Sequence, residues 1–308
     1  MAQNKEMTNC FTPTLLLGET HFFHRNQPGV IAAAIDRMSG EGFFRGVEIA
    51  DVAVFEDRRR IGRIMRDQST RLTYWTSMIL YEEQLNLSAL DEDLRRKSVA
   101  RIKQEMNFAA ECEAACFAVL SGPDPGPAYR AVGTEQLFRS LCELAEALKA
   151  FSGLRLLLEP LDREAHKNAL IGPTPEAVGL ARRVRQIHPM FGLSWDTAHA
   201  ALCGEDLFEA IRAGRSCIAQ IHLANAVLDR QDPRFGDHHM PIGKPGFLDV
   251  KVIADLFRMA MEIGWFGDNR PGVSVEVRTA QGNDPWETVT QCRRILEEAW
   301  TLFAEGPA

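Results

Sequence analysis

Four apolar segments in the second half of the chain each end on a side chain that can bind a metal ion. Their last residues are Glu159, Asp196, His222 and Glu276. The carboxyl ends of strands in one barrel lie at the same edge, so these four side chains can converge on one point. Three carboxylates and one imidazole around a point are suitable ligands for a divalent cation. The spacing therefore predicts a metal-dependent enzyme.

Each of these residues also has a simpler explanation. Glu159 can face solvent, His222 can be a core histidine, Asp196 can cap the next helix, and Glu276 can pair with Arg278. Their occurrence at equivalent points of consecutive strand–helix units favours the metal site. One nitrogen and three oxygen donors, without cysteine, suit Mn²⁺ best, and Mg²⁺, Co²⁺ and Zn²⁺ are alternatives.

Short apolar strands alternate with longer amphipathic segments along the chain. Strands are predicted at residues 13–18, 44–50, 71–78, 115–121, 154–160, 190–196, 217–222 and 271–277. Helices are predicted at residues 29–39, 56–67, 91–112, 133–151, 174–187, 205–213, 248–263 and 285–304. Eight such units favour a closed (β/α)8 TIM barrel. We expect one domain over residues 1–308, with the barrel at about 13–304 and flexible ends.

An open, doubly wound sheet is the structural alternative. Such a sheet usually has a glycine-rich, phosphate-binding turn after its first strand. The corresponding turn here reads Gly18-Glu19-Thr20-His21, which is not a loop of that kind. The closed barrel is therefore preferred.

Composition limits the partners and the location. The 308-residue chain has a net charge of −7 and no stretch dominated by Lys and Arg, which argues against nucleic acid as a partner. It has no apolar run long enough to span a bilayer, and its start lacks the apolar core of a signal peptide. Seven scattered cysteines are expected to be reduced, as in a cytoplasmic protein. A homo-oligomer is compatible with these features.

The strand ends carry motifs that resemble a known family, the xylose isomerase-like barrels, also called the sugar phosphate isomerase/epimerase superfamily. The segment 158–166 is similar to the family's Leu-Glu-Pro-Leu-Asn-Arg-x-Glu-x-His, with Asp162 in place of Asn and one residue fewer before the second Glu. The segment 194–199 resembles its Asp-Thr-x-His element, and 220–223 and 274–278 match its seventh and eighth strand ends. The resemblance implies that Glu159, Asp196, His222 and Glu276 bind the metal and that the two Glu residues transfer protons.

A second polar cluster follows strand seven, in a segment from Ala224 to Phe247 that is expected to be a long loop. Its Asp237 and His239 resemble an Asp-x-His element of the endonuclease IV branch, in which the equivalents of His199, Asp237 and His239 hold a further metal. The histidines that complete the nuclease centre are missing after strands three and four. We therefore expect His199, Asp237 and His239 to bind substrate; a second metal and purely local loop contacts are the alternatives.

The family resemblance and the ligand set together predict an isomerase or epimerase of a keto or aldo sugar, or of a sugar acid. A divalent ion can stabilise the enediolate that forms when a proton leaves the carbon beside a carbonyl, and carboxylates can remove and return that proton. A lyase that dehydrates a keto-cyclitol or eliminates from a 3-keto-glycoside is the alternative, because it starts with the same step. The further residues expected to contact the carbohydrate are Glu48, Arg163, Glu164, His166 and Arg278.

Overall fold

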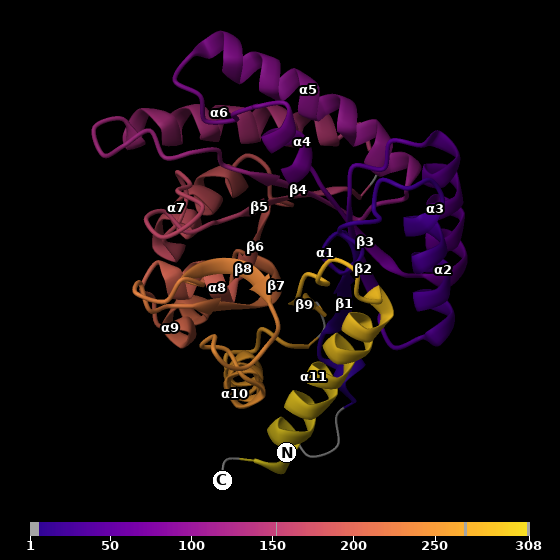
Figure 1. Ribbon diagram of the computed structural model, residues 1–308. Helices are drawn as coiled ribbons and strands as arrows, with labels where there is room; N and C mark the ends of the chain where they lie inside the picture. The colour runs from indigo at the N-terminus through magenta and orange to yellow at the C-terminus, as the bar shows by residue number, and fades with distance from the viewer. Residues whose placement is uncertain (1–5, 152, 268–269, 307–308) are drawn as a thin grey trace.

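The computed structural model describes residues 6–151, 153–267 and 270–306. Eight parallel strands form a closed barrel, in which each strand pairs with the next along the chain and the last barrel strand pairs with the first (Figure 1). The barrel strands are β1 (Thr12–Leu16), β2 (Gly46–Ala50), β3 (Arg71–Trp75), β4 (Cys116–Leu120), β5 (Arg155–Glu159), β6 (Gly192–Asp196), β7 (Ile218–Val227) and β9 (Gly272–Glu276). The predicted (β/α)8 TIM-barrel fold is confirmed.

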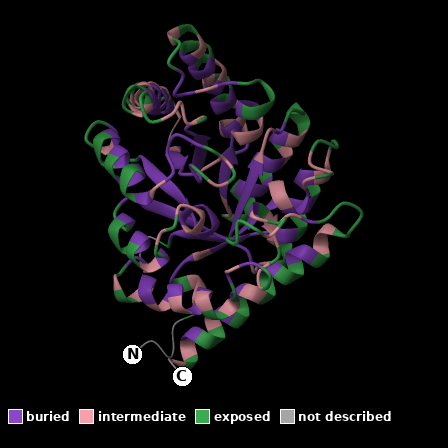
Figure 2. Cartoon of the chain, turned by 60° about the vertical axis from the view of Figure 1, so that its left-hand side comes forward, coloured by how far each residue is buried: buried purple, intermediate pink, exposed green. Residues whose placement is uncertain are grey.

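Helices surround the barrel, and their outer faces are exposed whereas the strands are buried (Figure 2). The major helices are α2 (Val30–Glu41), α3 (Phe55–Gln68), α5 (Glu92–Glu111), α6 (Arg130–Leu148), α7 (Thr174–Arg185), α9 (Leu207–Gly214), α10 (Val250–Glu262) and α11 (Pro285–Glu305). Within the described ranges, no helix is long and apolar enough to cross a membrane. The chain ends were expected to be flexible. Of these ends, residues 1–5 and 307–308 lie outside the described part of the chain.

Short elements that the sequence did not predict also occur. They are η1 (Met7–Asn9), α1 (Leu17–Thr20), α4 (Ser77–Glu82), α8 (Thr197–Leu202) and β8 (Gly236–Met240). Of these, α1, α4 and α8 directly follow the barrel strands β1, β3 and β6, whose carboxyl ends form the active face of such barrels. They therefore shape the mouth of the barrel.

The predicted loop after strand seven was wrong in part. Strand β7 does not end at His222; it continues to Val227, and all ten of its residues are buried. Its second half pairs with β8 in an antiparallel hairpin. The polar sequence of β8, which includes Asp237 and His239, hides this strand because it lacks the alternation of apolar residues that marks a half-buried strand.

A polar network fills the barrel interior beneath the mouth. Gln220 on β7 donates to Glu48 on β2 at 2.9 Å and to Ser194 on β6 at 3.0 Å, and it accepts from Thr73 on β3 at 3.1 Å. Strands β2 and β3 are not neighbours of β7, so these side chains meet across the barrel. All four are almost completely buried. The network fixes side chains from opposite walls relative to one another.

Candidate active site

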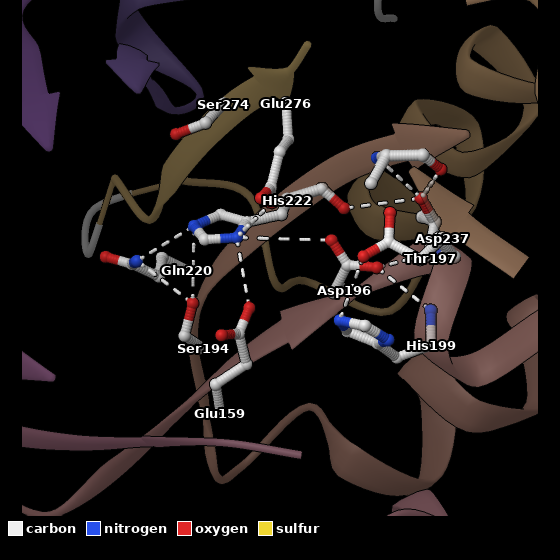
Figure 3. Close-up of polar contacts among 12 residues, drawn as sticks. Glu159, Ser194, Asp196, Thr197, His199, Gln220, His222, Asp237, Ser274 and Glu276 are labelled. Atoms are coloured by element: carbon white, nitrogen blue, oxygen red, sulfur yellow. Dashed lines mark hydrogen bonds and ion pairs between the residues drawn. The ribbon is translucent and has the colours of Figure 1, made fainter. Parts of the chain in front are cut away.

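The last residues of β5, β6 and β9, together with His222 in the middle of β7, bring four potential metal ligands together. One ligand atom from each of Glu159, Asp196, His222 and Glu276 lies within 4.8 Å of all the others. His222 Nδ1 is 2.8 Å from Glu276 Oε2, 3.2 Å from Glu159 Oε1 and 4.0 Å from Asp196 Oδ2. Figure 3 shows the imidazole of His222 directed at these carboxylates. The convergence predicted from the strand ends is therefore present.

The orientation of the imidazole is set from behind by Glu48. Its Oε2 lies 3.1 Å from His222 Nε2 and accepts from Trp75 Nε1 at 2.7 Å. Burial alone would raise the pKa of Glu48, but His222 and the hydrogen bonds outweigh it and hold that pKa below its usual value. Glu48 therefore stays ionised, and the other nitrogen, His222 Nδ1, faces the carboxylates without a hydrogen-bond partner among the described residues.

Charge in this cluster is unbalanced. Burial would lower the pKa of His222, but the carboxylates of Glu48 and Glu276 hold it well above its usual value. Burial is the main cause that raises the pKa of Asp196 to about 7, and Glu276 adds to the shift. Buried carboxylates of this kind require a compensating cation. The imidazole nitrogen, the three carboxylates and their separation fit a divalent metal ion with mixed oxygen and nitrogen ligands.

A second cluster surrounds Asp237, which is almost fully buried. Its Oδ2 lies 3.0 Å from Lys167 Nζ, 3.5 Å from His239 Nε2 and 3.8 Å from His199 Nε2. The other ring nitrogen of His199, Nδ1, is 3.2 Å from Asp162 Oδ2. Burial opposes ionisation of Asp237, but His239, His199 and Lys167 hold its pKa well below its usual value. This carboxylate therefore lies within ion-pair distance of one ammonium and two imidazoles.

Glu276 connects the two clusters. Its Oε2 faces His222 Nδ1 at 2.8 Å, and its Oε1 faces His239 Nδ1 at 2.7 Å. The two imidazoles outweigh burial and hold the pKa of Glu276 well below its usual value. Potential ligand atoms of Glu19, His239 and Glu276 also lie within 4.8 Å of one another, but Arg278 binds both oxygens of Glu19 at 2.6 and 3.1 Å. An arginine there competes with a second cation.

A cavity of about 220 Å³ opens above the four candidate ligands. Its polar side includes Glu159, His222 and Glu276, together with His199 and His239. The lining also includes apolar and aromatic side chains, namely Phe22, Trp75, Met78, Tyr81 and Leu161. A site that combines charged and aromatic side chains suits a polyhydroxylated ring that also presents C–H groups.

Not every residue expected at the substrate lies at this cavity. His199, His239 and Arg278 line it, and Asp237 is buried behind them. Glu48 is fully buried and contacts His222, so the structure gives it an orienting position in place of the substrate contact that was one of its expected roles.

Three other expected substrate residues lie outside the described cavity lining. Arg163 is buried and pairs with Glu176, at 2.8 Å for its Nη1. The side chain of Glu164 is 74% exposed and lies 3.9 Å from Arg130. The ring of His166 contacts that of His238. We therefore leave Arg163, Glu164 and His166 out of the proposed substrate contacts.

The turn after β5 explains this difference. Asp162 Oδ1 accepts hydrogen bonds from the backbone N–H groups of His166 and Lys167. This turn directs Lys167 into the cavity, a residue that the sequence analysis did not select. The available signal for this turn was Asp162, which the sequence analysis noted only as a departure from the family's Asn. Glu19 was also missed because the turn after strand one was judged only for phosphate binding.

The fold and the four-residue cluster define a TIM barrel with a candidate metal centre at its carboxyl face. A family described as xylose isomerase-like TIM barrels matches residues 36–296, and the chain belongs to this family. No curated protein sequence shows significant similarity to the chain.

Solved structures share the fold at low sequence identity. A D-psicose 3-epimerase from Clostridium cellulolyticum H10, in complex with D-tagatose, aligns with a TM-score of 0.69 at 16% identity, over 95% of this chain and 99% of that one. A 3-keto-D-glucoside 4-epimerase from E. coli aligns with a TM-score of 0.64 at 16% identity, over 96% and 100% of the two chains. An AP endonuclease of family 2 from Brucella melitensis aligns with a TM-score of 0.64 at 19% identity, over 90% of this chain and 96% of that one. These likenesses establish the architecture.

Proposed function

We propose that this protein is a divalent-metal-dependent sugar epimerase or isomerase that moves a proton at the carbon beside the carbonyl of a keto or aldo sugar. The observation that carries the proposal is the convergence of His222 Nδ1 and three buried carboxylates beside a cavity. Glu159, Asp196, His222 and Glu276 would hold the metal, with Mn²⁺ as our first choice. The whole chain would act as one cytoplasmic domain. The epimerases among the similar structures support the substrate class.

The two glutamates are placed for proton transfer. When bound, a divalent ion would stabilise the negative charge that develops on the substrate oxygens. Glu159 at the end of β5 and Glu276 at the end of β9 both line the cavity and come from different sides of the barrel. One carboxylate can therefore remove a proton from one face of the sugar while the other returns a proton to the opposite face. His199, His239 and Lys167 line the same cavity and can donate hydrogen bonds to hydroxyl groups.

Nuclease activity is less well supported. The residues that follow β3 and β4 are Thr76, Ser77 and Ser121, which provide no imidazole for a multinuclear centre. At the second cluster, the ammonium of Lys167 lies 3.0 Å from Asp237 and supplies the positive charge that a further metal would bring. Burial would lower the pKa of Lys167, but Asp237 outweighs it and raises that pKa, so the ammonium is charged at neutral pH. These contacts favour a single metal ion.

Deuterium exchange tests the proposal directly. Keto and aldo sugars, including 3-keto-glucosides, would be incubated with the Mn²⁺-loaded protein in heavy water and followed by NMR. We expect uptake at one carbon beside the carbonyl and no uptake after treatment with a chelator. Loss of a hydroxyl or an aglycone together with uptake would assign the lyase alternative. Absence of exchange from every sugar, with folded and loaded protein, would refute the proposal.

Removal of His239 tests the single-metal assignment. We expect His239→Ala to keep about one metal ion per chain, as in the wild type, because Lys167 and His199 remain at Asp237. Its substrate binding should weaken by about 1–3 kcal/mol, the cost of a lost buried hydrogen bond. Elemental analysis of dialysed protein measures the stoichiometry. Two ions in the wild type and one in His239→Ala would contradict the assignment.

Glu48 should tune metal affinity without touching the metal. A carboxylate that accepts from the second nitrogen of a ligating histidine fixes the ring and increases its basicity. We expect Glu48→Gln to weaken metal binding by about 10–100-fold, the usual range for such partners. Competition with a fluorescent chelator measures the affinity. Glu298→Gln, an exposed site on α11, is the control; equal affinities of the two variants would show that Glu48 has no such role.

A further inference from the structure

A second cavity adjoins the first on the same face of the barrel. It has a volume of about 370 Å³, and its walls include Tyr81, Leu120, Leu161 and Lys167, all of which also line the first cavity. The two spaces are therefore neighbours that share these side chains as walls. The additional walls come from α4, from the segment between α4 and α5, from the first turns of α5, and from the segments that follow β4 and β5.

The lining of this second cavity is mainly hydrocarbon. The side chains found here and not in the first cavity include Leu80, Leu85, Leu87, Leu94 and Ala169. Leu80, Leu85, Leu87 and Ala169 are buried. The hydroxyl groups of a sugar ring need hydrogen-bond partners, and most of them would find none in such surroundings.

Asn86, Gln84 and Lys167 provide polar side chains in the lining of the second cavity. The Oδ1 atom of Asn86 accepts from the backbone N–H and the hydroxyl of Ser88, both at 2.8 Å. Gln84 is exposed, so it lies at the solvent side. The ammonium of Lys167, at the junction, pairs with Asp237 and keeps further N–H groups for another acceptor. Lys167 is therefore a polar group with spare donors that lines both cavities.

We propose that the second cavity binds an aromatic aglycone, so that the substrate is an aryl glycoside carrying the carbonyl on its sugar. This inference rests on the proposed function. The sugar would occupy the first cavity above Glu159 and Glu276, and the ring of the aglycone would occupy the second. An engineered cavity of about 150 Å³ holds benzene, so the larger space here accommodates an aromatic ring or a fused pair of rings. Lys167 would donate a hydrogen bond to the oxygen that links the two parts.

Paired glycosides test the proposal. The probes are phenyl and methyl 3-keto-β-D-glucopyranoside, and their affinities for the Mn²⁺-loaded protein would be measured by calorimetry. Because the phenyl ring leaves water for an apolar cavity, we expect it to strengthen binding by about tenfold or more. Ala169→Phe and, separately, Leu94→Trp fill the second cavity and should abolish the preference for phenyl while the methyl glycoside binds as before. Ala150→Phe, at an exposed position, is the control for added bulk and should keep the preference.

The outcomes separate this inference from the proposed function. Equal binding of the two glycosides, or no detectable binding of the phenyl glycoside, would overturn the aglycone site. Phenyl-selective binding that survives in both folded cavity-filling variants would also overturn it. Selective binding without deuterium exchange in any sugar would refute the proposed reaction and leave the aglycone site standing. Deuterium exchange without a preference for the phenyl glycoside would support the proposed reaction and refute the aglycone site.

Discussion

Replacement of His222 by alanine is expected to remove the bound metal and to lower activity by more than about 100-fold. Loss of a residue that only hydrogen-bonds a metal ligand typically lowers activity by about 10–100-fold, and loss of the ligand itself should cost more. His222 provides the one nitrogen of the candidate site, and its Nδ1 lies within 4.0 Å of all three carboxylates. Without the imidazole, the buried carboxylates lose both a ligand partner and a compensating charge. Elemental analysis of dialysed protein should then fall from about one ion per chain to near zero.

Loss of the imidazole from a buried cluster also endangers folding, so a second variant is required. Glu159→Gln keeps the size of the side chain and removes only its charge, and it should lose the metal while the barrel remains folded by circular dichroism. His238→Ala is the matched control, since this histidine is exposed and points away from the ligand set. If His222→Ala retained as much metal as the wild type, the assignment of the site would fail.

In the fraction of the protein that retains its metal, substitution of Glu276 by glutamine should uncouple proton exchange from inversion. If Glu159 removes the proton from one face of the sugar, the substrate of Glu276→Gln can still exchange that proton with solvent. An amide at position 276 cannot deliver a proton to the opposite face, so inversion should fall by about 10²–10⁴-fold, the usual range for a general acid. NMR in heavy water measures both quantities in one sample, as deuterium content and as the ratio of epimers.

The uncoupling depends on retained metal, which elemental analysis of the same sample verifies. An enzyme that uses one base for both steps would lose or keep exchange and product formation together. Normal inversion in metal-loaded Glu276→Gln would show that Glu276 serves only as a ligand. The proton donor would then have to be sought among the other titratable groups at the cavity, foremost His199 and Lys167.

The parts of the structure that the sequence predicted are those with a strong local signal. Buried parallel strands appear as short apolar runs, and the residue that ends each run lies at the face that carries the site. The ends of β5, β6 and β9 could therefore be located without knowledge of the packing, whereas β7 continues five residues beyond its predicted end at His222. For the same reason, the boundaries of the major helices and of the barrel strands other than β7 agree with the prediction to within three residues.

The parts that were missed depend on contacts that a sequence does not show. Lys167 enters the cavity because Asp162 binds two backbone N–H groups and turns the chain, and this turn also carries Glu164 to the surface. The β7–β8 hairpin forms because the buried second half of β7 pairs with a polar strand. The second cavity arises from the way side chains of α4 and of distant loops pack together, which has no signature in any single segment.

The polar layer inside the barrel bears on which ions the site can accept. His222 is fixed by Glu48, which is itself bound by Trp75 and Gln220 from two other strands. A ring held in this way keeps the position of the one nitrogen ligand nearly constant, which limits how far the site can widen around a larger ion. Ca²⁺ takes oxygen ligands at about 2.3–2.6 Å in adaptable shells, whereas Mg²⁺ requires about 2.0–2.1 Å. A rigid pocket of this kind should therefore reject Ca²⁺ in favour of smaller divalent ions even where Ca²⁺ is abundant.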